Sequence, residues 1–190
     1  MKSSYVDNNY KNVFKALCFQ VKPTSIVEFG ILEGYSLHAM IESSPNTTRI
    51  EAYDLFDEFP YNAAVYQTVK QNFSQYDNVQ IKKGNFFGHE KNYSNGDIDI
   101  LHIDIANDGE TYKHALDNYM EKISIGGVCV LEGGSKERDD VWWMNKFSKP
   151  SIVEVISNEQ YTEKYDIQVL DDYPSLTLIS HKWGRIRWVN

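Results

Sequence analysis

Residues 26–36 read IVEFGILEGYS, and this stretch decides how the chain folds. A short β-branched and apolar run, which contains Glu28, leads directly into a segment with two glycines, Gly30 and Gly34. The pattern predicts a strand that turns sharply into a helix at the glycines. Glycine at such a turn lets a ligand approach the backbone, and the first N–H groups of the helix then face an anion. The stretch therefore predicts a seat for a nucleotide-like ligand that carries a carboxylate or a phosphate.

The glycine spacing differs from that of two common phosphate-binding turns. Dinucleotide folds use G-x-G-x-x-G and P-loops use G-x-x-x-x-G-K-[ST], whereas here the spacing is G-x-x-x-G without a lysine. Taken alone, the turn fits a structural bend equally well. The next strand, in RIEAYDLFDEFP, ends at Asp54. A nucleotide-binding α/β unit places an acid about 20 residues past the turn to accept hydrogen bonds from ribose hydroxyls, and capping of a helix or turn is the alternative.

Apolar runs alternate with segments of helical period along most of the chain. The middle runs are continuously apolar, which is typical of strands covered on both faces. The expected strands are Ser25–Phe29, Arg49–Asp54, Val79–Lys83, Ile98–Ile103, Gly127–Leu131, Tyr165–Leu170 and Leu176–Ser180. Such alternation predicts a parallel sheet with helices on both faces.

Helices are expected between these strands. The clearest apolar stripe runs from Tyr112 to Met120, and Asn107 with Glu110 predicts a capping box before it. The expected helices are Asn8–Phe19, Tyr35–Ser43, Asn62–Phe73, the striped segment, and Glu137–Phe147 with Ser135 as a cap.

The end of the chain breaks the alternation. YDIQVLDDYPSLTLIS contains two strand-like runs joined by Asp-Asp-Tyr-Pro, which is turn chemistry. A hairpin over residues 165–181 makes one of its strands run against the parallel strands. No repeat or linker divides the chain, so residues 1–190 are predicted to form a single α/β domain. We expect a doubly wound, mostly parallel seven-stranded sheet, with a lead-in helix within residues 1–24.

Charge and cysteine content restrict the partners and the compartment. The chain carries a net charge of −8, which argues against binding to nucleic acid or to an anionic membrane. Cys18 and Cys129 are the only cysteines and lack the spacing of a zinc or disulfide motif. No signal-peptide core and no run of membrane-spanning length is present. These features predict a cytoplasmic protein with a small-molecule ligand.

Five segments in register resemble a known family. VEFGILEGYS, AYDLFDEFP, VQIKKGNFF, DILHIDIANDGETY and ISIGGVCVLEGGS follow, in order, the motifs of class I S-adenosylmethionine-dependent methyltransferases. The nearest type is the small O-methyltransferases related to macrolide-sugar methyltransferases and cephalosporin-hydroxylase-type proteins. The resemblance covers roughly residues 25–135. It implies a Rossmann-like fold, S-adenosylmethionine as the cofactor, and methyl transfer to oxygen on a small polar, hydroxylated or sugar-containing metabolite.

The resemblance also implies which residues hold the cofactor. The first motif would contact the methionine part, the acid after the second strand the ribose, the segment after the third strand the adenine, and the acid after the fourth strand the region of the transferred methyl. The matching residues are Glu28, Gly30, Gly34, Ser36, Asp54, Leu55, Phe56, Gly84, Asn85, Phe86 and Asp104.

The residues for chemistry are less well defined. Methyl transfer needs the acceptor held in line with the methyl group, and a proton must leave a hydroxyl acceptor. Asp104, His102 and Glu132 are the candidate catalytic residues, although a histidine within a strand is also a common core residue. Beyond the fifth strand, Arg138 and Trp142 are candidates for binding the acceptor, and a core or solvated position is the alternative for both.

A divalent metal is a further possibility under the resemblance. Related O-methyltransferases hold one with an acid after strand four and an Asp-Asp or Asp-Asn pair after strand five. Here that pair is Glu132 and Gly133, and glycine has no side chain to bind a metal. Oxygen ligands for Mg²⁺ would come from Asp104 and Glu132, with Asp108 and Glu110 nearby in sequence.

Two other functions remain open at this point. The missing second acid favours a catalytically inactive protein that binds S-adenosylmethionine as a sensor or assembly subunit. A nicotinamide-dependent enzyme is the third hypothesis, and the G-x-x-x-G spacing argues against it. Because 190 residues leave little room for a cap domain, the acceptor site is expected to be open or completed in a homo-oligomer.

Overall fold

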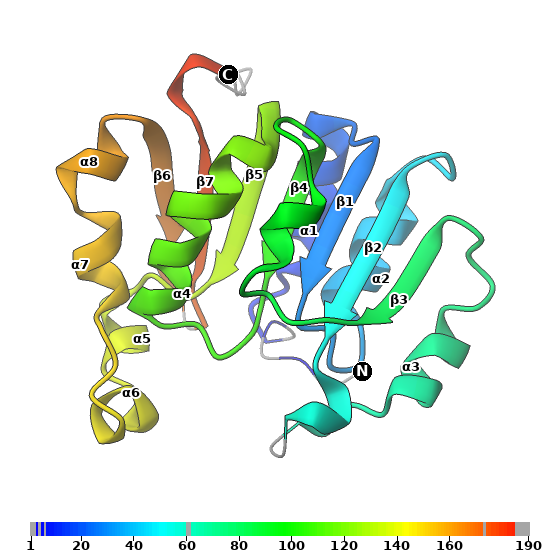
Figure 1. Cartoon of the computed structure of the whole chain (residues 1–190), viewed down its shortest axis with the longest axis horizontal. Helices are drawn as coiled ribbons and strands as arrows, with labels where there is room; N and C mark the ends of the chain where they lie inside the picture. Colours follow the sequence, from blue (N-terminus) through cyan, green and yellow to red (C-terminus); the bar gives the residue numbers. More distant parts are fainter. Residues whose placement is uncertain (1–2, 4, 6, 60–61, 173, 185–190) are drawn as a thin grey trace.

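A single mixed sheet organises the molecule (Figure 1). The computed structural model describes residues 3, 5, 7–59, 62–172 and 174–184. The sheet has the order β3-β2-β1-β4-β5-β7-β6. Its strands are β1 (Ser25–Phe29), β2 (Arg49–Asp54), β3 (Val79–Lys83), β4 (Ile98–Ile103), β5 (Ile123–Glu132), β6 (Tyr165–Leu170) and β7 (Leu176–His181).

The predicted seven-stranded, doubly wound sheet is confirmed. Strands β1 to β5 pair in parallel, and β7 runs antiparallel to both of its neighbours, β5 and β6. The strand that opposes the rest is therefore the second of the terminal hairpin. Strand β5 begins four residues earlier than expected, at Ile123 in place of Gly127. The chain leaves β1 toward β2 and returns through β4, so the order reverses between β1 and β4, where α/β sheets bind their ligands.

Helices cover both faces of the sheet (Figure 1). The α-helices are α1 (Lys11–Val21), α2 (Tyr35–Ser43), α3 (Tyr66–Asn72), α4 (Gly109–His114), α5 (Lys136–Asp139), α6 (Trp142–Lys146), α7 (Ile152–Ile156) and α8 (Glu159–Thr162). The shorter turns are η1 (Phe56–Glu58), η2 (His89–Asn92), the π-turn η3 (Ala115–Tyr119), η4 (Met120–Lys122) and η5 (Lys182–Gly184). Every helix in the described ranges is too short or too polar to span a lipid bilayer.

The core lies in two layers, one on each side of the sheet. Because side chains alternate along a strand, neighbouring residues of β1 belong to different layers: Ile26 packs with α1 and α2, whereas Val27 packs with α4. All five residues of β1 are buried, as a strand covered on both faces requires. The centre of the sheet is thus fixed by packing from both sides.

The helix expected over Glu137–Phe147 is broken in two. Helix α5 ends at Asp139, and Val141 adopts an extended conformation before α6 begins. The Asp139 carboxylate accepts hydrogen bonds from the hydroxyl of Ser151 and from the backbone N–H groups of Ile152 and Val153, at 2.6–3.0 Å. The break places this carboxylate at the start of α7, a helix that the sequence pattern did not predict.

The capping box predicted at Asn107 and Glu110 is wrong by one residue. The cap of α4 is Asp108, whose Oδ1 accepts from the backbone N–H of Thr111 at 2.9 Å. Asn107 is fully buried, and its Nδ2 donates to the carbonyl oxygens of Ile103 and Glu132, at 2.9 and 2.8 Å. Asn107 therefore joins the ends of β4 and β5, close to where a ligand would bind. The predicted cap Ser135 is confirmed at α5.

Candidate functional site

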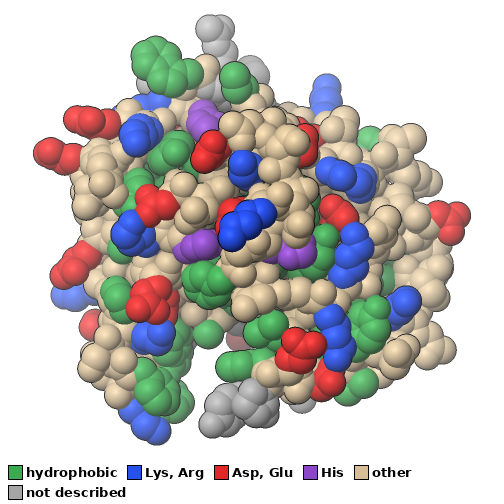
Figure 2. Space-filling model, in the orientation of Figure 1, with side chains coloured by type: hydrophobic (Ala, Val, Ile, Leu, Met, Phe, Trp, Pro, Cys, Tyr) green, Lys and Arg blue, Asp and Glu red, His purple; other side chains and the backbone are tan. Residues whose placement is uncertain are grey.

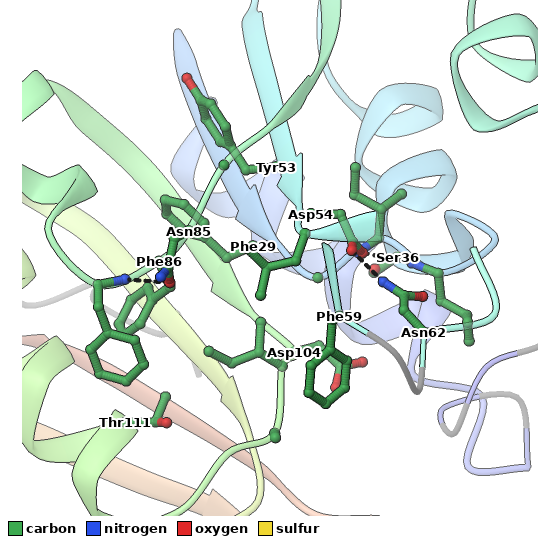
Figure 3. Close-up of a pocket in the computed structure, with 18 of the residues that line it drawn as sticks. Phe29, Ser36, Tyr53, Asp54, Phe59, Asn62, Asn85, Phe86, Asp104 and Thr111 are labelled. Atoms are coloured by element: carbon green, nitrogen blue, oxygen red, sulfur yellow. Dashed lines mark hydrogen bonds between the residues drawn. The ribbon is translucent and has the colours of Figure 1, made fainter. Parts of the chain in front are cut away.

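A cavity of about 580 Å³ opens at the carboxyl ends of the central strands. In Figure 2 it is the hollow at the lower edge of the molecule, and Figure 3 shows the residues around it. Its walls come from the turns after β1, β2, β3 and β4 and from the loop that precedes α7. The size lies within the range of cavities that bind cofactors and other small molecules. The cavity is therefore at the switch point of the sheet, where the glycine turn predicts a ligand.

The backbone conformation and the packing of the turn both require glycine at positions 30 and 34. Gly30 has φ of +89°, and a Cβ on it would lie 1.9 Å from the carbonyl oxygen of Asp104 at the end of β4. Gly34 has φ of +80°, and its Cβ would lie 2.4 Å from the ring of Phe73. Gly30 lines the cavity, whereas Gly34 caps α2 just outside the lining. The clash with the Asp104 carbonyl oxygen predicts that any larger side chain at position 30 disturbs the turn itself.

Asp54 braces this turn from the neighbouring strand. Its Oδ2 accepts from the N–H groups of Ile31 and Leu32, at 2.8 and 3.4 Å. Its Oδ1 accepts from the N–H of Phe56 at 2.8 Å and from Nδ2 of Asn62 at 2.5 Å. Asp54 lines the cavity, as expected for a ribose-binding acid, yet four donors already occupy its oxygens. The capping role that was the alternative for this acid is thus present in the structure.

Glu28 lies beneath the cavity floor and not in its lining. Its Oε1 accepts from the hydroxyl of Ser36 at 2.5 Å and is 2.7 Å from Nδ1 of His102, while its buried Oε2 has no hydrogen-bond partner among the described residues. The other ring nitrogen of His102 is 3.4 Å from the hydroxyl of Tyr5. His102 is fully buried among aromatic rings of the α1 layer, including Phe14. Ser36 lines the cavity, so Glu28 reaches the site only through it.

The segment after β3 forms an aromatic wall. Gly84, Asn85 and Phe86 line the cavity, as does Leu55 from the turn after β2. The Phe86 ring stacks on Tyr119, with ring centroids 4.8 Å apart and an interplanar angle of 8°. Further aromatic lining comes from Phe29, Tyr53, Phe59 and Phe87. Phe56 differs from its expectation, because it is fully buried in the α1 layer and does not line the cavity.

Asp104 follows β4 and lines the cavity close to the glycine turn (Figure 3). Burial and the neighbouring Glu132 carboxyl raise the pKa of Asp104 to about 7, while His102 and, to a smaller extent, Arg138 oppose the shift. Burial also raises the pKa of Glu132, which Arg138 counteracts through a hydrogen bond. Asp104 is thus a carboxyl with a raised pKa that lies within the cavity and next to the turn.

The structure keeps the other candidate chemical residues out of the cavity lining. Nε of Arg138 donates to Oε1 of Glu132 at 2.7 Å, and its Nη2 donates to the carbonyl oxygen of Asn107 at 2.8 Å. The predicted acceptor residue Arg138 therefore neutralises a buried acid. Trp142 is 69% exposed on α6, with Lys146 over its ring. Among the described residues, no group of three or more His, Cys, Asp or Glu is arranged to hold a metal ion.

A family model described as "Methyltransferase domain" matches residues 27–132, more than half of the chain. The chain belongs to this methyltransferase-domain family. The match begins inside β1 and ends at the last residue of β5, so it contains the turns that form most of the cavity. No curated protein matches this sequence.

Solved methyltransferase structures share the fold. An O-methyltransferase of Bacillus cereus in complex with SAH matches with a TM-score of 0.71 and 15% identity, over 95% of this chain and 84% of that one. A methyltransferase of Podospora anserina bound to SAH matches with a TM-score of 0.66 and 20% identity, over 96% and 80%. A SAM-dependent O-methyltransferase of Thermotoga maritima matches with a TM-score of 0.64 and 15% identity, over 97% and 68%.

The sequence of this methyltransferase domain did not predict that Lys149, Asn62 and Phe59 line the cavity. Lys149 lines the cavity from the loop before α7, and its Nζ is 2.8 Å from Oδ2 of Asp108 and 3.2 Å from Oε2 of Glu110. Asn62 and Phe59 also line it from the segment after β2. Lys149 carries no local sequence signal, because it reaches the site only when the loop packs on α4. Pro at position 150 was the one available sign of a loop there.

Proposed function

We propose that this protein is an S-adenosylmethionine-dependent methyltransferase that transfers a methyl group to oxygen on a small hydroxylated acceptor. The observation that carries the proposal is the cavity at the switch point, bounded on one side by the Gly30 turn and on another by Asp104. Membership of the methyltransferase-domain family supports the same reaction class. The SAH-bound relatives of the same fold support the choice of cofactor.

The residues present fit this cofactor. S-adenosylmethionine has an aromatic base, a ribose and a cationic sulfur, and the cavity offers aromatic rings, an Asp54–Asn62 pair and the Asp104 carboxyl. Among the described residues, Nδ2 of Asn62 is the side-chain donor to Asp54, so it is the contact that a ribose hydroxyl would replace. Ser36 donates its proton to Glu28, so it presents an acceptor oxygen to the ligand. When bound, the cofactor supplies a methyl group attached to a positively charged sulfur.

Asp104 is the residue that we propose to take the proton from the acceptor hydroxyl. A general base works best when its pKa lies near the working pH, and burial together with Glu132 raises the pKa of Asp104 to about 7. His102 is unsuited to the role because Glu28 and Tyr5 engage its two ring nitrogens away from the cavity. Glu132 is likewise held by Arg138. A bound metal is not required by this proposal.

Ligand binding and turnover separate the three candidate functions. Titration calorimetry with S-adenosylmethionine, SAH and NADP⁺ should show binding of the first two and none of the third. Release of SAH in the presence of a library of hydroxylated acceptors then measures turnover. Asp104→Asn should keep SAH binding and lose at least about tenfold in kcat. Binding without turnover of any acceptor would favour the sensor or assembly subunit, and binding of NADP⁺ alone would overturn the proposal.

The compartment and the assembly remain proposals as well. Cys18 and Cys129 are both free and buried, which fits the cytoplasm that we propose as the location. The cavity is open to solvent at its mouth, so a homo-oligomer in which a second copy covers it is consistent with the geometry. Sedimentation of the purified protein with and without SAH would measure this.

A further inference from the structure

The cavity has two chemically distinct walls. The turns after β1, β2 and β3 provide the residues that we assign to the cofactor, from Gly30 to Phe86. The remaining wall is formed by residues 104–111 after β4 and by Lys149 from the loop before α7. If the cofactor occupies the first wall, the second is left for the acceptor. The chemistry of the second wall then determines which acceptors can bind.

The second wall is tightly built. The N–H of Gly109 donates to the carbonyl oxygen of Pro150 at 2.9 Å, and a Cβ on Gly109 would lie 2.7 Å from the carbonyl oxygen of Ser151. The loop that carries Lys149 is therefore in close contact with the start of α4. Asp108, only 3% exposed, uses one carboxylate oxygen to cap α4 and the other to bind Lys149. Neither partner of this ion pair can turn away without breaking a second interaction.

Carboxylates outnumber ammonium groups on this wall. Lys149 faces both Asp108 and Glu110, so its single positive charge is matched by two negative charges, with Asp104 further along the same wall. An anionic acceptor would approach Glu110 and would have to compete with Asp108 for the ammonium group. Like charges placed close together in a partly desolvated site cost binding energy, and such repulsion is a common source of specificity.

We propose that this wall makes the protein selective for neutral or cationic hydroxylated acceptors and against anionic ones, with Glu110 and Lys149 as the specificity-determining residues. This inference rests on the proposed function. Lys149 donates to an acceptor oxygen, and Glu110 accepts from a hydroxyl or an ammonium group. Phe87, which is 47% exposed and lines the cavity, offers an apolar face for the body of the acceptor. Acceptors that carry a phosphate or a carboxylate are excluded.

Two matched series test the selectivity. Catechol, dopamine and 3,4-dihydroxybenzoate share a vicinal diol and differ in charge, as do glucose, glucosamine and glucuronate. Each is titrated into the SAH-saturated protein, and each is assayed for methylation. The neutral and cationic members of at least one series should bind at least about tenfold more tightly than the anionic member, and the preference should weaken as salt is raised. Preference for the anionic member, equal binding of all three, or binding of none of the six would overturn the inference.

Substitutions assign the selectivity to the two residues. Glu110→Lys should reverse the order and favour the anionic member by about tenfold. Lys149→Met should raise the KM of neutral acceptors with an unchanged KM for S-adenosylmethionine, and Lys149→Arg should restore it. Lys113→Met is the matched control, because Lys113 is an exposed lysine of α4 that pairs with Asp117 outside the cavity.

If Glu110→Lys still binds SAH and still binds the neutral and cationic acceptors more tightly than the anionic one, the specificity roles of Glu110 and Lys149 are overturned. If the unaltered protein does not bind SAH, the proposed function itself is refuted. Failure of the selectivity and failure of the proposed function are therefore distinguishable.

Discussion

Single residues at the glycine turn serve the fold and the site at once. Leu32 has φ of +48°, a conformation that costs energy for a leucine, and its N–H is held by Asp54. Gly30 leaves room for the carbonyl oxygen of Asp104, which brings β1 and β4 together at the cavity. A residue that matches a ligand-binding motif is therefore also a structural requirement. Substitutions here report on ligand binding only when the free energy of unfolding is measured alongside.

Gly30→Ala should destabilise the protein far more than Gly88→Ala. The two glycines have nearly the same φ, +89° and +86°, but a Cβ on Gly88 would have no atom of the described residues within 4 Å. Gly88→Ala should cost only the left-handed strain, roughly 1–2 kcal/mol. Gly30→Ala adds the clash with Asp104 and should lose more than about 3 kcal/mol in urea unfolding. Equal losses would show that the turn relaxes and that close contact with β4 is not needed.

Among the elements, the segment between β5 and β6 departs most from its sequence pattern. Helices α5 and α6 replace one predicted helix, and α7 and α8 follow before the hairpin. The break lets the Asp139 carboxylate accept hydrogen bonds from Ser151 and from the first N–H groups of α7. This arrangement fixes the loop that carries Lys149, and so it shapes one wall of the cavity.

Asp139→Ala should lower the free energy of unfolding by about 1 kcal/mol, as loss of a side-chain acceptor for the first N–H groups of a helix does, although the cap Ser151 remains. The amide protons of Ile152 and Val153 should exchange faster, since they lose their acceptor. Asp140→Ala is the control, because Asp140 is adjacent and exposed. Hydrogen exchange and urea unfolding measure both effects. The same loss in the two variants would mean that Asp139 does not hold α7 in solution.

At the scale of the molecule, the neighbouring carboxyls of Asp104 and Glu132, at the carboxyl ends of β4 and β5, couple stability to pH. The pKa of Asp104 is raised from its ordinary range to about 7 by burial and by Glu132. Between roughly pH 4 and 7 the unfolded chain therefore releases a proton that the folded protein still holds. Stability falls as pH rises through this window, and the full penalty is present above pH 7.

Asp104→Asn should remove that penalty. The variant should match the unaltered protein near pH 4 and exceed it at pH 8 by roughly 1–2 kcal/mol, less than the full shift because solvent reaches the cavity. Asp57→Asn is the control, since a hydrogen bond from Lys83 lowers the pKa of the exposed Asp57, and removal of the Asp57 carboxylate should not stabilise the protein at pH 8. Thermal unfolding across this pH range provides the measurement. If Asp104→Asn is less stable than the unaltered protein at pH 8, the raised pKa of Asp104 is contradicted.

The sequence by itself determined the sheet and the place of the cavity. The predicted bounds of β1 and β2 match the structure, because each strand is a short segment rich in apolar residues that ends at a turn, β1 at Gly30 and β2 after Asp54. The glycine turn, Asp54, the Gly84–Phe86 segment and Asp104 could be placed at one edge, because parallel strands bring their carboxyl ends together. The local sequence pattern suffices for these features, since each strand and the turn that follows it are continuous in sequence.

Only the tertiary structure decided which polar side chains reach the cavity. Glu28 and His102 lie on strands that end at the site, yet alternation turns them into the α1 layer, where they pair. Arg138 forms an ion pair with Glu132 and stays out of the cavity lining. A buried carboxylate without a charged partner costs free energy, and this ion pair offsets that cost. Lys149 enters from a distant loop through packing on α4. Partners of this kind are set by side-chain direction and long-range packing, and a linear pattern contains neither.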